Sequence, residues 1–403
     1  MCIRDSILTV VAAVFPAFAV SVSVMSKDHF AGIFWIPFLV LFVETVRTRG
    51  RVLCRPWVGA AAIALAIPLV LARRPNVYVL ILCVVVLLVI SVSRARKRLL
   101  VGTALVLVVT SLVWPRIVLP GLGVRPGKIN DMLTVPVQQT ARTAARHGDS
   151  IPASERAAID AVLRWGTLAK VYQPRRSAPV VSRWQNAATT EQKLAYARVW
   201  FAQLTRYPGT YLAATANITF PFFAPVTPVN YPNEQPAEDR RARQARYVDG
   251  FLEHSVEGTT REQIEEVVFG LYQAPALTTL RSAVNKATMA AMTGNVLASM
   301  AFYCSWLPLF VLGFALRRRS WLLALATTPL FINLLILVAG PRASGRYIVP
   351  MVLGSVLLAG LAMIPVHWLP VGRSRERSQV DPIEQTGAAA TAQVTRTGPD
   401  ERD

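Results

Sequence analysis

The sequence is poor in the residues that build metal and disulfide sites. It contains four cysteines and four histidines in 403 residues. Neither set has the paired spacing of a disulfide framework or a zinc site. The scattered residues are Cys2, Cys54, Cys83 and Cys304, with His29, His147, His254 and His367. A phosphate-cradling glycine loop and a nucleophile elbow are missing as well. The sequence therefore does not support a zinc enzyme, a P-loop protein or a disulfide-stapled domain.

Acidic residues are scarce too. The chain has 23 Asp and Glu against 43 Lys and Arg, which gives a formal net charge of +20. The basic residues form short clusters beside apolar runs, and no basic stripe interleaved with aromatics favours nucleic-acid binding. With 53% hydrophobic and 16% charged residues, the chain is too apolar for one soluble domain of its length. Composition therefore predicts a polytopic membrane protein.

The opening "MCIRDS" does not resemble the apolar run that follows it. Met-Cys-Ile-Arg-Asp-Ser is what the transposase mosaic end used in sequencing libraries encodes. We therefore interpret residues 1–6 as adapter sequence. On this interpretation, the gene is cut off at its 5′ side.

Eight apolar stretches approach the roughly 20 residues that a spanning helix needs. They are Ile7 to Val24, Phe30 to Val46, Trp57 to Ala72, Val77 to Val92, Leu99 to Val118, Ala291 to Leu316, Trp321 to Gly340 and Tyr347 to Leu369. The third and fourth are short and fit either two spans or one re-entrant hairpin. We expect an all-α fold with five spans in residues 7–118 and three in residues 289–370.

The basic residues of the short loops predict the orientation, because cytoplasmic loops are enriched in Lys and Arg. In an eight-span arrangement, one side carries fourteen such residues and the other carries five. The richer side is predicted to be cytoplasmic, in a bacterial plasma membrane. Residues 119–288 then form an extracytoplasmic domain, and residues 371–403 form a disordered cytoplasmic tail.

The region of residues 119–288 has helical patterning. "IPASERAAIDAVLRW" predicts a helix capped by Ser154, and "TTEQKLAYARVWFAQLTRYPG" predicts one capped by Thr190 and broken at Pro208. A later helical stretch is interrupted by Pro275. We therefore expect a mainly helical domain without an internal repeat.

Two external boundaries of the spans carry candidate site residues. In "MSKDHF", Lys27 and Asp28 could bind a donor phosphate or a metal, with Asp28 as the metal ligand. In "PRASGRYIVP", Arg342, Arg346 and Tyr347 could bind phosphate, because arginine forks match phosphate oxygens. The structural alternative is that these residues only flank the lipid headgroups.

Weaker candidates lie in the external region. "NDMLTVPVQQTAR" combines Asp131 with Gln138, Gln139 and Arg142, which could bind a polar ligand or hydrogen bond to the backbone. "VYQPRRSAPVVSRW" adds basic residues that could meet a pyrophosphate or form a solvated face, namely Arg175, Arg176 and Arg183.

Four segments together resemble a bacterial family of polytopic proteins known as domain of unknown function 6020. They are "VFPAFAVSVSVMSKDHFAG", "DMLTVPVQQTAR", "YPGTYLAATANITFPFFAP" and "PRASGRYIVPMVLG". The matching positions are Lys27, Asp28 and Phe30, then Pro136, Gln138 and Gln139, then Tyr207, Pro208, Tyr211 and Leu212, and finally Arg346, Tyr347 and Pro350. His29 separates Asp28 from Phe30, which departs from the family pattern.

That family in turn resembles the membrane glycosyltransferases of the C superfamily. The resemblance implies transfer of a sugar from a polyprenyl-phosphate donor at the external face to a glycan or protein acceptor. A divalent cation such as Mg²⁺ or Mn²⁺, or arginines, would hold the phosphate, and a carboxylate would act as general base. In the resembled enzymes that base lies in the first external loop, so we expect it ahead of Ile7, outside this sequence.

Two alternatives stay open. A metal-independent glycan ligase would use arginines of the external region, so it predicts loss of activity when Arg142, Arg175 or Arg183 is changed to Ala, and insensitivity to chelators. A non-catalytic membrane protein, such as a transporter of lipid-linked glycans or an envelope assembly scaffold, predicts that Asp28→Asn is silent and that no sugar is transferred.

Overall fold

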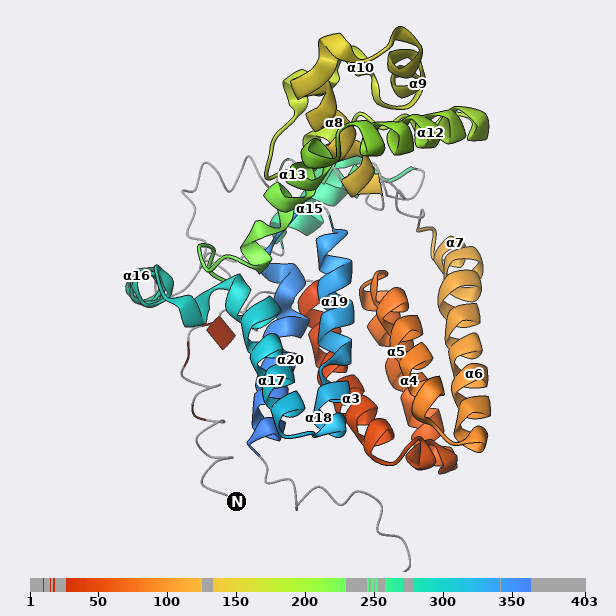
Figure 1. The fold of residues 1–403 in the computed structure, drawn as a ribbon, viewed down its shortest axis with the longest axis vertical. Coiled ribbons are helices and arrows are strands. Elements are labelled where there is room, and N and C mark those ends of the chain that lie inside the picture. Colours follow the sequence, from red (N-terminus) through yellow and green to blue (C-terminus); the bar gives the residue numbers. More distant parts are fainter. Residues whose placement is uncertain are drawn as a thin grey trace, which may run out of the picture. The chain divides into compact units, whose positions relative to one another are not determined.

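A computed structural model describes residues 10, 15, 17–18, 27–124, 133–229, 245, 248–249, 251–252, 258–270, 278–340 and 342–363. These residues belong to the first of two compact units, Met1–Ile364. Within them every regular element is a helix (Figure 1). The expectation of an all-α protein is therefore confirmed for the described part of the chain.

A first group of apolar helices follows the N-terminal segment. It consists of α3 (Lys27–Arg47), α4 (Pro56–Ala72), α5 (Asn76–Ile90) and α6 (Ser93–Val108), the last continued by η2 (Val109–Val118) and α7 (Leu119–Gly121). Prolines lie inside α3 and α4, and η2 is a π-helical stretch that contains Pro115. Apolar helices of membrane proteins tolerate such prolines, because local π-type adjustments and neighbouring helices satisfy the backbone groups that are left without partners.

A second group closes the described chain. Its helices are η7 (Phe302–Trp306) with α17 (Leu307–Arg317), α18 (Trp321–Ala326) with α19 (Thr328–Val338), and η8 (Gly345–Ile348) with α20 (Val349–Ala362). Figure 1 shows α4, α5 and α6 next to one another, and α18 and α20 contact α3.

Four helices are long and apolar enough to cross a membrane: Lys27–Arg47, Ser93–Gly121, Trp321–Val338 and Gly345–Ala362. Three further apolar helices are shorter, namely Pro56–Ala72, Asn76–Ile90 and Phe302–Arg317. A helix of 15 residues is about 22 Å long, less than the roughly 30 Å of a hydrocarbon core. The described chain is thus a helical membrane protein with four candidate spans, and the count of eight remains a prediction.

The helices match the predicted spans unevenly. The first predicted span falls almost entirely outside the described residues, as does the end of the eighth. The sixth was predicted to begin at Ala291, but its helix begins at Phe302. The reason is that α16 (Thr278–Met292) ends just after Ala291 and is followed by η6 (Val296–Ala298), where Asn295 Oδ1 accepts a hydrogen bond from the Leu297 N–H at 3.0 Å.

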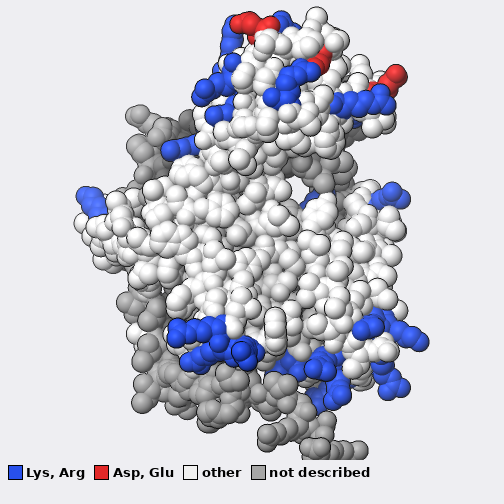
Figure 2. Space-filling model, viewed as in Figure 1, with Lys and Arg blue, Asp and Glu red and all other residues white. Residues whose placement is uncertain are grey.

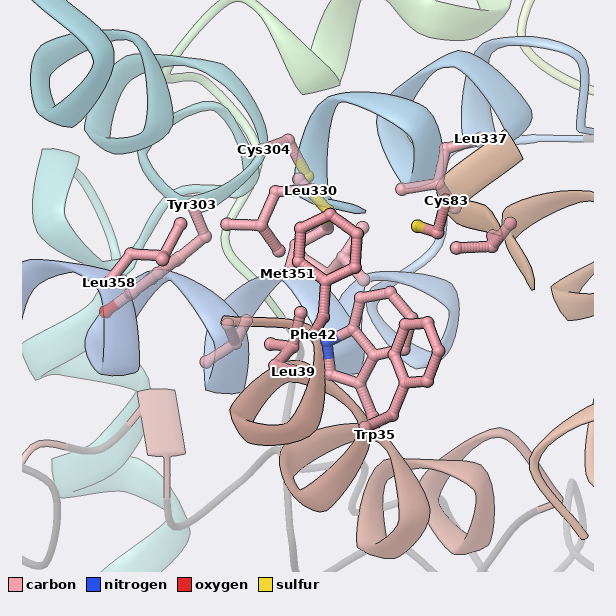
Figure 3. Packing of buried hydrophobic residues seen from close by; sticks show 14 of the residues in the cluster. Trp35, Leu39, Phe42, Cys83, Tyr303, Cys304, Leu330, Leu337, Met351 and Leu358 are labelled. Atoms are coloured by element: carbon pink, nitrogen blue, oxygen red, sulfur yellow. The ribbon is translucent and has the colours of Figure 1, made fainter. Parts of the chain in front are cut away.

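Close packing holds the two groups of apolar helices together (Figure 3). Trp35 and Leu39 of α3 are buried against Leu330 of α19. Gly354 of α20 makes this approach possible: a Cβ atom at this position would lie 2.7 Å from Leu330 Cδ2 and 2.8 Å from Leu39 Cδ1. Small residues allow close helix approach in membrane proteins, so Gly354 sets the spacing of α3, α19 and α20.

The apolar helices have one strongly basic end. The turns between α3 and α4 and between α5 and α6 meet there, since the Val92 N–H donates to Arg49 O at 3.1 Å and Arg98 Nη1 donates to Leu53 O at 2.9 Å. On the face drawn in Figure 2, Lys and Arg gather at this end beside a broad uncharged band. We call it the basic end; its residues are Arg47, Arg49, Arg51, Arg55, Arg94, Arg96, Lys97 and Arg98, with Arg317, Arg318 and Arg319 of the α17–α18 turn.

Residues 133–229 form a smaller helical layer with its own core. Its helices are α8 (Thr134–His147), α9 (Ala153–Leu163), α10 (Trp165–Val171), α11 (Ala178–Val181), α12 (Thr190–Arg206) and α13 (Pro208–Thr219), followed by η5 (Phe220–Phe222). Val137, Ile159, Leu163 and Tyr196 are buried in its core. The Ser305 hydroxyl donates to Phe222 O at 2.8 Å and thereby ties this layer to η7.

Both predicted helix caps of this layer were misplaced. Helix α9 begins at Ala153 after Pro152, and Ser154 lies inside it, so it is not the cap. The cap of α12 is Thr189 rather than Thr190, with a reciprocal capping box to Gln192. The break at Pro208 is confirmed, because α12 ends at Arg206 and α13 starts at Pro208. Pro275 lies outside the described residues.

Candidate functional site

A buried carboxylate stands at the end of the apolar helices opposite to the basic end. Asp28 lies in the first turn of α3 and is 1% exposed. The helix macrodipole favours an acidic side chain at this position. Burial, however, makes an isolated carboxylate costly, so a charged partner is needed nearby.

Arg73 is the buried partner of Asp28. It follows the last residue of α4, is 7% exposed, and its Nε lies 3.5 Å from Asp28 Oδ1. Its Nη1 donates to Tyr347 O at 3.3 Å. Burial lowers the pKa of the Arg73 guanidinium, whereas the charge of Asp28 raises it. The short turn between α4 and α5 thus carries a cation into the interface between α3 and η8.

Arg346 lies near the other oxygen of the same carboxylate. Its Nε lies 3.8 Å from Asp28 Oδ2, and its Nη2 donates to the Tyr347 hydroxyl at 2.6 Å. The guanidinium carbon also lies 4.7 Å from the centroid of the Tyr347 ring, within the range of a cation–π contact. The Arg346 side chain is 46% exposed. Arg346 therefore connects the buried pair to the surface.

The cluster carries more positive than negative charge. Asp28 supplies one carboxylate against the guanidiniums of Arg73 and Arg346, and the exposed Lys27 precedes it in sequence. Both ion-pair distances are longer than a hydrogen bond, and Asp28 Oδ2 has no hydrogen-bond partner among the described residues. The chemistry of this set suits an anion with several oxygens, because arginine binds phosphate and carboxylate bidentately.

A divalent cation is a poorer match to this donor set. The part of the chain that the structure describes contains no group of three or more His, Cys, Asp and Glu side chains that could hold a metal ion. Asp28 would offer one carboxylate whose immediate neighbours are two cations. Hard cations such as Mg²⁺ usually combine carboxylates with water or substrate phosphate oxygens. A metal at Asp28 stays a prediction, and the arrangement favours arginines as the phosphate ligands.

The structure brings together some of the predicted site residues and adds another. Asp28, Arg346 and Tyr347 come from segments far apart in the sequence and share one cluster. Arg342 is exposed and makes no ion pair with the described residues. In the sequence, Arg73 is one of two adjacent arginines between the third and fourth apolar stretches, and it was not among the predicted site residues. A pair of arginines on the side that is poor in basic residues was the signal that could have identified it.

The paired amides of α8 are engaged inside the smaller layer. Gln139 donates to Thr215 Oγ1 at 3.0 Å and accepts from Trp200 Nε1 at 3.0 Å. Gln138 donates to Gln173 O at 2.6 Å, and its Oε1 has no hydrogen-bond partner among the described residues. Both amides are buried. These contacts give Gln139 a structural role, whereas ligand binding by Gln138 stays a prediction.

The arginine candidates of the external region differ in their contacts and exposure. Arg142 donates to the Tyr172 hydroxyl at 2.9 Å. Arg175 lies over the ring of Phe220 at 4.9 Å, and Arg176 is exposed. Arg183 is half-buried, and Asp131 lies outside the described residues. The alternative that these arginines bind a pyrophosphate therefore stays a prediction.

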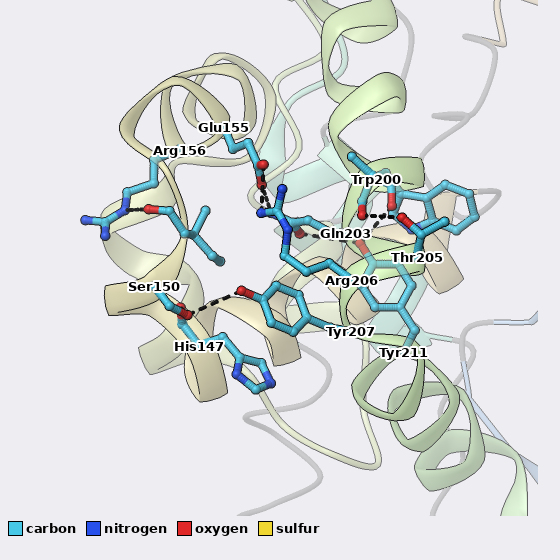
Figure 4. A network of polar contacts seen from close by, with 12 residues as sticks. His147, Ser150, Glu155, Arg156, Trp200, Gln203, Thr205, Arg206, Tyr207 and Tyr211 are labelled. Atoms are coloured by element: carbon cyan, nitrogen blue, oxygen red, sulfur yellow. Dashed lines mark hydrogen bonds and ion pairs between the residues drawn. The ribbon is translucent and has the colours of Figure 1, made fainter.

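A second group of polar contacts joins four helices of the smaller layer, α8, α9, α12 and α13 (Figure 4). Glu155 of α9 binds Arg206 Nη1 at 2.9 Å and accepts from Gln203 Nε2 at 3.1 Å. The ring of His147 stacks on Tyr207 with 4.3 Å between centroids, and its Nε2 lies 3.0 Å from Thr210 Oγ1. Sequence reasoning did not identify this network. Its contacts tie α12 to α9 and α13 to α8.

Apolar helices of membrane length, with a charge cluster at one end, define a helical membrane protein with a candidate anion site. A family profile described as "Family of unknown function (DUF6020)" matches residues 2–380. The match covers most of the chain, so the protein belongs to this family, as the four sequence segments indicated. No match is found among curated proteins or among solved structures.

Proposed function

We propose that the protein is a glycosyltransferase-like membrane protein that acts on a polyprenyl-phosphate sugar at the end of its helices that carries Asp28. The observation that supports this proposal most directly is the excess of cations around Asp28, with Arg73 buried and Arg346 half-exposed. The phosphate of a lipid-linked sugar lies at the membrane surface, which is where the apolar helices end. The lipid chain would lie along the helices, and the phosphate would meet Arg346 and Lys27.

In this proposal the cluster residues have separate tasks. Arg346 and Lys27 contact the donor phosphate and neutralise charge on the leaving group. Asp28 and Arg73 position Arg346. Asp28 attracts the guanidinium of Arg346, and Arg73 donates a hydrogen bond to the backbone oxygen of the neighbouring Tyr347.

The proposed orientation follows from charge. Clusters of Lys and Arg favour the cytoplasmic side of a membrane, so the basic end would face the cytoplasm of a bacterial cell. The Asp28 cluster and the layer of residues 133–229 would then face outward, where lipid-linked sugars meet glycan or protein acceptors.

Sugar transfer by the reconstituted full-length protein tests this function. We expect Arg346→Gln to lower turnover about tenfold or more, the loss that a missing charge-assisted contact of about 1.4 kcal/mol causes. Arg342→Gln is the matched control, since Arg342 is exposed and lies outside the cluster. Unchanged activity in the presence of a chelator would favour arginine over metal binding of the phosphate. If no lipid-linked donor supports transfer and Asp28→Asn changes nothing, a scaffold or transporter role is favoured.

A further inference from the structure

A cavity of about 400 Å³ lies between α3, α4, α5 and α6, far along the helices from the Asp28 cluster. It is lined by the C-terminal half of α3 and by side chains along α4, α5 and α6, for example by Phe42, Leu87, Ile63 and Gly102. The lining reaches the basic end, since it includes Lys97 and Arg98. The volume lies within the range of about 300–1,000 Å³ that is typical of small-molecule pockets.

The lining of this cavity suits hydrocarbon. Most of it consists of aliphatic and aromatic side chains, including Phe38, Leu80 and Val106. The hydroxyl of Thr45, which also lines it, donates to Leu41 O at 2.7 Å and is therefore engaged. An acyl chain that leaves the bilayer for this cavity stays in apolar surroundings, and it gains packing contacts by filling the empty volume.

Two cations stand in the same lining. Lys97 and Arg98 belong to the first turns of α6 and are exposed. One guanidinium nitrogen of Arg98 donates a hydrogen bond to Leu53 O. Long basic side chains at the ends of membrane helices extend toward the headgroups of lipids. An apolar cavity with cations at its rim therefore complements a ligand with a hydrocarbon chain and an anionic head.

The cavity is next to a surface that lipid can reach. Helix α6, with its continuation, is the least buried of the four candidate spans. Its residue Val101 lines the cavity and is 70% exposed. Gly102 of α6 faces Ile63 of α4 without a side chain, and a Cβ atom there would lie 3.4 Å from Ile63 Cγ1. Because Val101 both lines the cavity and is exposed, a chain in the surrounding bilayer can reach the cavity beside α6.

We propose that this cavity binds one acyl chain of an anionic phospholipid from the leaflet at the basic end, with the headgroup phosphate on Lys97 and Arg98. The site is separate from the Asp28 cluster, which lies at the other end of the same helices. It requires that the helices are in a membrane but does not depend on sugar transfer.

Retention of lipid by the purified full-length protein tests this site. The protein is reconstituted with equal amounts of phosphatidylglycerol and phosphatidylcholine that carry the same acyl chains, and the lipid that stays bound after delipidation is counted by native mass spectrometry. We expect phosphatidylglycerol to be retained in preference to phosphatidylcholine. Lys97→Gln should lower this preference about fivefold, the contribution of one basic residue near a membrane surface.

Matched variants separate a built site from general surface attraction. Arg317→Gln removes the same charge at the same end, but Arg317 does not line the cavity, so retention should not change. Gly102→Leu and Ala62→Leu fill the cavity from opposite helices and should abolish retention of both lipids; the unfolding midpoint shows which of these variants folds. Equal retention of both lipids by the wild type, or equal loss with Lys97→Gln and Arg317→Gln, would overturn the proposal. So would undiminished retention in a folded cavity-filling variant.

Discussion

Asp28 and Arg73 show how single residues determine the chemistry of the candidate site. Both are buried, and Asp28 has an ion-pair partner on each of its two oxygens. Removing one partner of a buried pair leaves the other charge without compensation in a medium of low polarity. The pair therefore contributes to stability as well as to the placement of Arg346.

The first prediction concerns this pair. Arg73→Gln should destabilise the protein by about 3 kcal/mol, because it leaves the buried carboxylate without its closest cation. Thermal unfolding of the purified protein in detergent measures the change. The neighbouring Arg74→Gln is a matched control, since Arg74 is exposed and its loss should cost less than about 0.5 kcal/mol. Equal effects of the two variants would show that Arg73 and Asp28 do not form a stabilising pair.

At the scale of helices, packing between the two groups depends on a small residue. Gly354 lies where Trp35, Leu39 and Leu330 converge, and a larger side chain there would overlap with their atoms. Overpacking of this kind forces side chains from their preferred rotamers or moves the helices apart.

We predict that Gly354→Leu lowers the stability of the protein by about 2 kcal/mol or more, because α20 must move away from α3 and α19. Gly313→Leu on α17 is the control, since a Cβ atom at Gly313 would meet no atom within 4 Å. Unfolding midpoints of the two variants provide the comparison. A shift in the midpoint of the Gly313 variant as large as that of the Gly354 variant would contradict this account of the packing.

The sequence predicted the helices well, but not the contacts between them. Apolar runs directly indicate α3, α4, α5 and α19, because a helix that is apolar on all sides requires a nonpolar environment. The sixth span was predicted to begin too early, because many of the residues before Phe302 are apolar as well. In the structure, the turn at Asn295 separates these residues from the helix. Arg73 lies beside Asp28 only because the fold brings residues 28, 73 and 346 together. Their spacing along the chain does not predict this contact.

The charge distribution of the whole molecule predicts its orientation. Basic residues gather at one end of the apolar helices (Figure 2). The cluster around Asp28 lies at the other end, because Asp28 belongs to the first turn of α3. Because basic loops stay in the cytoplasm, we expect the two ends to be accessible from opposite sides of the membrane.

Labelling of introduced cysteines with a membrane-impermeant maleimide in intact cells measures this orientation. Arg74→Cys, in the exposed turn between α4 and α5, should react from outside, whereas Lys97→Cys should react only after the cells are opened. The parent for both variants lacks Cys54, which is partly exposed. Labelling of Lys97→Cys in intact cells would reverse the orientation and place the Asp28 cluster in the cytoplasm.

The central claim is that the cluster around Asp28 binds the phosphate of a lipid-linked substrate. Its most direct test compares the affinity of the purified protein for a polyprenyl phosphate with its affinity for the uncharged polyprenol of the same length. We predict that the phosphate binds at least about tenfold more tightly, a difference of about 1.4 kcal/mol, and that Arg346→Gln removes most of this difference while Arg342→Gln preserves it. Equal affinity for the two lipids, or a difference that survives in Arg346→Gln, would contradict the claim.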